Sequence, residues 1–100
     1  MKKYIVTIGS SFIIDLELTA DIAHSCYHSG ICDDDVQYAQ KLPEIQEQMS
    51  KINDDTLRKV ISEIWGENIA NEMDREWLEC YALFEASALF VDGVYEELET

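Results

Sequence analysis

The chain has 100 residues, of which 21 are acidic and 7 are basic, so its formal net charge is −14 at pH 7. This charge repels nucleic-acid phosphates and anionic lipids and attracts basic protein surfaces, which argues against direct binding to DNA, RNA or membranes. Hydrophobic residues make up 47% of the chain and aromatic residues 10%, which predicts one folded domain spanning residues 1–100 and not a disordered acidic chain.

The first 18 residues have the pattern of a β-hairpin. Residues 4–8 are mostly β-branched or aromatic, residues 9–11 (Gly-Ser-Ser) suit a turn, and residues 12–18 place Phe12 and every second residue after it on one apolar face. A two-stranded hairpin is marginal alone, so we expect its apolar face to pack on helices. Each outer edge is expected to offer unpaired backbone groups that a partner strand could use.

Helical patterns dominate residues 19–100. Thr19 is a candidate N-cap for a helix over residues 20–29, and Gly30 suits its C-terminal end. The acidic triplet Asp33, Asp34 and Asp35 can cap and charge the N-terminus of a helical stretch that reaches Leu42, because the helix dipole favours carboxylates there.

Two further helical stretches are predicted in the middle of the chain. Pro43 cannot comfortably continue the preceding helix but suits the first turn of a stretch over residues 43–52. Asn53 begins a second capping cluster, with two aspartates after it. Residues 56–65 carry apolar side chains at helical spacing before Gly66 stops the pattern.

A last, long helix is predicted from near Asn68 or Asn71 to about Asp92. Between residues 78 and 91 it is apolar nearly all round, which is typical of a helix at the centre of a domain. The expected fold is therefore α+β: an N-terminal two-stranded β-hairpin followed by four helices, the last one long and central.

The sequence contains no recognisable catalytic or cofactor site. The one cluster of metal-ligand types is His24, Cys26, His28 and Cys32. On a helix, the two histidines share a face while Cys26 points elsewhere, and the spacing matches no common zinc motif. We therefore predict no enzyme activity, no metal and no cofactor. A metal- or redox-sensing protein using these four residues remains a third hypothesis.

Acidic clusters are the candidate binding residues. Carboxylates at helical spacing should line one face at the start of the last helix. Others follow its apolar body, where the dipole opposes them and no local base offsets them. Such a rigid array can occupy a Lys/Arg-lined nucleic-acid channel. The predicted partner-binding residues are Asp33, Asp34, Asp35, Glu72, Glu76, Glu79, Asp92, Glu96 and Glu97.

In overall character the chain resembles the small acidic antagonists made by phages and other mobile elements, in particular anti-CRISPR proteins and DNA-mimic antirestriction proteins. The resemblance covers the whole chain and is carried by its length, its acidity and the acidic clusters at residues 33–35, 53–55 and 72–79. It implies a non-enzymatic inhibitor in the cytoplasm of a bacterial host cell. Such an inhibitor would bind a basic surface of a protein or ribonucleoprotein complex, foremost a CRISPR effector, and block target DNA, guide handling or nuclease recruitment.

A different class of function is the main alternative. The acids could serve only to keep the protein soluble, while an apolar helix surface around Leu83, Leu89 and Phe90 binds a partner. The protein would then be an intracellular interaction or regulatory module, and a homodimer is one form it could take.

Overall fold

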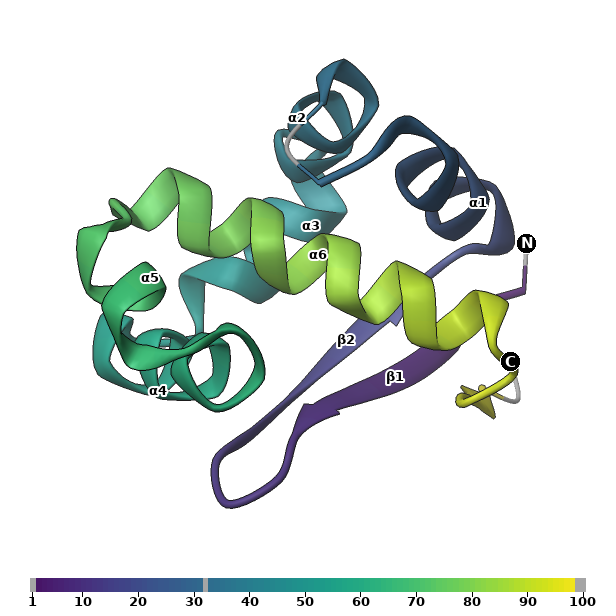
Figure 1. The fold of residues 1–100 in the computed structure, drawn as a ribbon. Coiled ribbons are helices and arrows are strands. Elements are labelled where there is room, and N and C mark those ends of the chain that lie inside the picture. Colours follow the sequence, from purple (N-terminus) through teal and green to yellow (C-terminus); the bar gives the residue numbers. More distant parts are fainter. Residues whose placement is uncertain (1, 32, 99–100) are drawn as a thin grey trace.

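The computed structural model describes residues 2–31 and 33–98. Within these residues the fold is α+β, with a three-stranded antiparallel sheet and six helices (Figure 1). In chain order the elements are β1 (Tyr4–Gly9), β2 (Ile13–Leu18), α1 (Ala20–Ser29), α2 (Asp34–Gln40), α3 (Pro43–Ser50), α4 (Asp54–Trp65), α5 (Glu67–Glu72), α6 (Arg75–Val91) and β3 (Glu96–Glu97).

The predicted N-terminal hairpin is confirmed. β1 pairs antiparallel with β2, from Tyr4 opposite Leu18 to Gly9 opposite Ile13. The alternating apolar residues of both strands are buried, as the period of a strand requires, but Phe12 precedes β2 and is exposed. Gly9 has φ +97°, and a Cβ atom there would lie 2.0 Å from the carbonyl oxygen of Phe12. The tight turn therefore requires glycine at this position.

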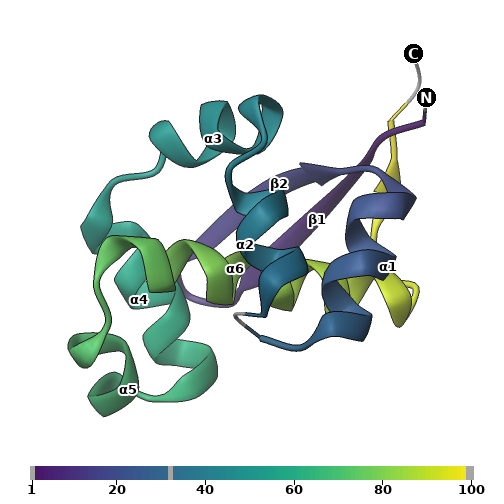
Figure 2. The same cartoon turned by 90° about the horizontal axis from the view of Figure 1, so that it is seen from above.

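A third strand that the sequence did not predict covers part of one hairpin edge. β3 pairs with β1 through Glu97 opposite Tyr4 and Glu96 opposite Ile5, which gives the strand order β2-β1-β3. The backbone N–H of Leu98 adds a hydrogen bond of 2.9 Å to the carbonyl oxygen of Lys3. Both views show this end of the chain returning to β1 beyond the end of α6 (Figures 1 and 2). The expectation that both outer edges are free was therefore wrong for the first residues of β1.

Helix α6 is the longest helix and the centre of the packing. It contacts α1, α2, α4 and both strands of the hairpin. Its buried apolar residues join the core that β1, β2 and the other helices build, as predicted for a long, central final helix. No helix within the described ranges has both the length and the apolar character needed to cross a membrane. The apolar residues of α6 that are buried are Leu78, Cys80, Ala82, Leu83, Ala86 and Phe90.

The predicted number of four helices was wrong, because the described residues form six. Leu42 is extended (φ −62°, ψ 140°), as expected for a residue before proline, so α2 and α3 are separate helices on either side of it. The last helix starts at Arg75 and not near Asn68 or Asn71. Residues 67–72 form α5 instead, and extended Met73 separates the two helices.

Candidate functional site

The acidic triplet lies at the N-terminus of α2, as predicted. Asp33 is the N-cap, and its carboxylate accepts a hydrogen bond of 2.8 Å from the backbone N–H of Asp34. Asp34 and Asp35 lie in the first turn, where the helix dipole stabilises negative charge. All three side chains are exposed, and none forms an ion pair within the described part of the chain. Their charge therefore faces solvent.

The second predicted cluster does not form one acidic face. Glu72 belongs to α5, whereas Glu76 and Glu79 belong to α6, and extended Met73 changes the direction of the chain between them. Glu72 and Glu76 are exposed, but Glu79 is only 7% exposed. Glu79 therefore points into the protein and cannot present its charge to a partner in this structure.

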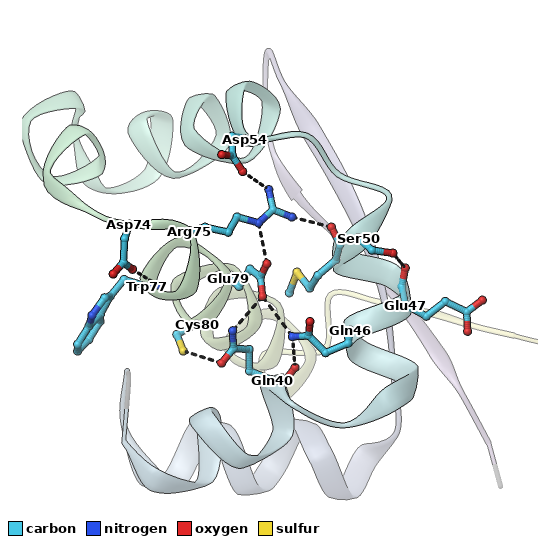
Figure 3. Close-up of polar contacts among 11 residues, drawn as sticks. Gln40, Gln46, Glu47, Ser50, Asp54, Asp74, Arg75, Trp77, Glu79 and Cys80 are labelled. Carbon is cyan, nitrogen blue, oxygen red and sulfur yellow. Dashed lines mark hydrogen bonds and ion pairs between the residues drawn. The ribbon is translucent and has the colours of Figure 1, made fainter.

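Glu79 is the acceptor at the centre of a buried polar network (Figure 3). Its Oε2 atom accepts a hydrogen bond of 2.6 Å from Nε of Arg75. Its Oε1 atom accepts from the side-chain amides of Gln40 at 2.9 Å and Gln46 at 3.3 Å. The thiol of Cys80 extends the network with a contact of 3.8 Å to Oε1 of Gln40. The network joins α2 and α3 to α6, so the role of Glu79 is structural.

Arg75 links this network to α4. Its Nη1 atom lies 2.7 Å from the carboxylate of Asp54, and its Nη2 atom donates to the carbonyl oxygen of Met49 at 2.6 Å. Burial by itself lowers the pKa of Arg75, but the hydrogen bonds to Glu79 and Asp54 outweigh it and the net pKa shift is upward. One guanidinium thus satisfies acceptors from three helices.

The third predicted cluster lies at the C-terminal end of α6 and on β3. Asp92 is the C-cap and is exposed, as is Glu96. Glu97 forms an ion pair of 3.0 Å with Lys2, whose pKa is raised by the hydrogen bond and charge of Glu97. The prediction that no base offsets this cluster was therefore wrong for Glu97, because the sheet brings Lys2 beside it.

The candidate acids occupy two ends of the molecule. Helix α6 is about 25 Å long, at about 1.5 Å per residue, so Glu76 and Asp92 lie far apart. Glu76 lies beside α2, because it lines one small cavity together with Gln37 of that helix. The triplet at the start of α2 and Glu76 thus belong to neighbouring elements. We call Asp33, Asp34, Asp35 and Glu76 the α2–α6 acidic surface.

Comparisons with protein-family models, with curated proteins and with solved structures found no match. The functional interpretation of this chain therefore depends on the geometry and charge of its own residues.

The predicted cluster of metal-ligand types does not converge. The rings of His24 and His28 stack on α1 with centroids 6.2 Å apart, whereas Cys26 is buried in the core. Burial raises the pKa of the Cys26 thiol to about 11, so it stays protonated at neutral pH and is a poor metal ligand. Cys32 lies outside the described residues. Within the described ranges, no three residues of these types lie close enough to hold one ion.

Glu63 of α4 holds the hairpin turn, a contact that sequence reasoning missed. Its Oε2 atom accepts hydrogen bonds from the Ser10 hydroxyl at 2.7 Å and the Ser11 N–H at 3.0 Å, and its Oε1 atom accepts from the Phe12 N–H at 2.8 Å. These hydrogen bonds lower the pKa of Glu63. In the sequence, only the polar residues of the turn indicate that such a contact could exist, and they do not identify Glu63 as the hydrogen-bond acceptor.

We expect Glu63 to tether the turn only while its carboxylate is charged. Since its pKa is lower in the folded state, the tether is fully present above the ordinary pKa of a glutamate and is lost as the pH falls through the lower folded value. Amide hydrogen exchange should show reduced protection of Ser11 and Phe12 at such low pH, and at neutral pH in Glu63→Gln. Unchanged protection in Glu63→Gln, as expected for the exposed control Glu67→Gln, would contradict this role.

Proposed function

We propose that this protein is a non-enzymatic acidic inhibitor that binds a basic surface of a nucleic-acid-handling complex. A CRISPR effector is the foremost candidate, and the occupied surface would be one that binds nucleic acid or recruits a nuclease. One observation carries the proposal: seven of the nine candidate acids are exposed and have no ion pair within the described part of the chain. They are Asp33, Asp34, Asp35, Glu72, Glu76, Asp92 and Glu96.

Five of the seven basic side chains contact other groups than these acids, among them Lys2, which pairs with Glu97, and Lys59, which lies over the ring of Phe12. Lys51 pairs with Glu47, and Arg75 pairs with Asp54 and Glu79. The guanidinium of Arg58 donates to backbone carbonyl groups that follow α4. Mutual repulsion among unpaired surface acids opposes folding, and a basic partner would relieve it. A fixed array of carboxylates on helix ends is suited to compete with the phosphates of a nucleic acid for such a partner.

The apolar-interface alternative loses the surface that it requires. Leu83 is fully buried and Phe90 is only 8% exposed, and both belong to the core around α6. Leu89 is partly buried and packs against the same core. Leu83 and Phe90 thus stabilise the fold and are not accessible to a partner in this structure, so we do not propose an interaction module built on them.

Affinity capture tests the proposal. The tagged protein is incubated with a bacterial lysate that contains CRISPR or restriction complexes, at low and at high ionic strength. We expect it to retain a nucleic-acid-handling complex at low ionic strength and to release it at high ionic strength, because exposed charges are screened within about 10 Å at 0.1 M salt. Retention that is insensitive to salt, or a partner that handles no nucleic acid, would contradict the proposal.

A further inference from the structure

A small cavity of about 100 Å³ opens between α2 and α6, beside the α2–α6 acidic surface. Gln37, Glu76, Trp77 and Cys80 line it. Among the lining residues Cys80 is buried, whereas Glu76 is exposed and Trp77 is 47% exposed. A cavity of this volume suits the head group of one side chain.

Trp77 is placed outside the core by the start of α6. Its backbone N–H donates to the N-cap carboxylate of Asp74 at 3.0 Å, which fixes the first turn of the helix. Its indole ring points away from the Arg75–Glu79 network, which occupies the other side of the same turns (Figure 3). Exposed tryptophan is unfavourable in water and is enriched among the residues that dominate binding interfaces.

The charges around the cavity define what can fill it. Glu76 lines the cavity and has no ion pair within the described residues, and none of the described residues that line the cavity is basic. The acidic triplet caps α2, the helix that contributes Gln37. A cation is therefore favoured over an anion or a neutral group. A tryptophan and a glutamate at one cavity suit the planar guanidinium group, which stacks on aromatic rings and forms paired hydrogen bonds with carboxylates.

On the basis of the function proposed above, we propose that this cavity receives an arginine side chain from the basic partner. The guanidinium stacks on the indole of Trp77 and forms an ion pair with the carboxylate of Glu76. The α2–α6 acidic surface attracts the partner over a longer range, and the cavity gives one arginine a defined position. The partner is thus expected to carry an exposed arginine at the centre of the bound surface.

Arginine binding can be measured on the intact protein without the partner. The chain has two tryptophans, so the indole N–H signals of Trp65 and Trp77 can be followed separately by NMR and assigned with Trp77→Phe. The probe is the blocked peptide Gly-Arg-Gly, and its matched control is Gly-citrulline-Gly, which has nearly the same shape and no charge. We expect the arginine peptide to shift the Trp77 signal saturably, with Trp65 unaffected, and the citrulline peptide to bind at least about tenfold more weakly, the effect of about 1.4 kcal/mol.

Matched variants locate the site. Glu76→Gln should weaken binding of the arginine peptide about tenfold, by removing a charge-assisted pair. Glu67→Gln removes an exposed acid that does not line the cavity and is not among the candidate binding residues, and it should leave the affinity unchanged. Three results would each overturn the arginine site: equal shifts with the arginine and citrulline peptides, equal binding of a lysine peptide, or unchanged binding of the arginine peptide by Glu76→Gln.

If these peptide results are negative while capture stays salt-dependent, the cavity proposal fails and the proposed function stands. If the arginine peptide binds but no partner is captured in a salt-dependent way, the proposed function fails and the arginine site stands.

Discussion

Replacing Arg75 with methionine is expected to lower the free energy of unfolding by about 3 kcal/mol. Glu79 is 7% exposed, and Arg75 is its only ion-pair partner within the described residues. The substitution leaves a buried carboxylate whose remaining donors, among the residues that the structure describes, are the amides of Gln40 and Gln46. It also removes the donors to Asp54 and Met49 that connect α6 with the segments before it. Urea unfolding monitored by circular dichroism measures the loss.

A double substitution separates two contributions to this loss of stability: the cost of leaving the Glu79 charge unpaired and the loss of the contacts of Arg75. Arg75→Met combined with Glu79→Met removes both charges, and we expect it to recover part of the stability, because buried ion pairs can often be replaced by apolar residues. Glu76→Gln, at an exposed position on the same helix, should change stability by no more than about 0.5 kcal/mol. An Arg75→Met protein with wild-type stability would contradict the structural role of the network.

Neutralising the α2–α6 acidic surface is expected to weaken binding to the captured complex by about 30-fold or more. The variant carries Asp33→Asn, Asp34→Asn, Asp35→Asn and Glu76→Gln. At about 0.5 kcal/mol for each exposed charge, four charges contribute about 2 kcal/mol. The four side chains are exposed, and the substitutions keep their shape, so the fold should be retained. Titration of the purified complex at low ionic strength gives the dissociation constants.

The matched control neutralises four exposed acids elsewhere and therefore has the same net charge. It carries Asp21→Asn, Glu44→Gln, Asp55→Asn and Glu67→Gln. We expect this control to lose much less affinity, because a partner in close contact responds to the position of charges and not only to their number. Equal weakening by both variants would assign binding to net charge alone and remove the α2–α6 acidic surface as the site.

The parts of the fold that the sequence predicts are those with local causes. The apolar alternation of residues 12–18 predicts a strand, and the structure buries Ile14, Leu16 and Leu18 of its apolar face. Thr19 and Asn53 predict helix starts, and both side chains accept the expected capping hydrogen bonds. Gly66 adopts φ +103° and ends α4. Each of these features depends on a few neighbouring residues, which is why the sequence reveals them.

The parts that the sequence misses depend on contacts between distant residues. The two glutamates of β3 have low strand propensity and pair only because the end of α6 directs them toward β1. Helical spacing assigns Glu79 to an acidic surface line, but the donors from Arg75, Gln40 and Gln46 stabilise it inside the protein. Four of the predicted site residues nonetheless lie on neighbouring elements at the α2–α6 acidic surface.

Competition at the captured complex tests the central claim most directly, namely that this protein inhibits by occupying a basic functional surface. The purified complex is incubated with its labelled nucleic acid or with its nuclease, and the protein is added in increasing amounts. The proposal predicts stoichiometric displacement of one of the two by the wild-type protein and by the charge-matched control, but not by the variant of the α2–α6 acidic surface. If the protein binds the complex while both nucleic acid and nuclease stay bound, the claim is contradicted.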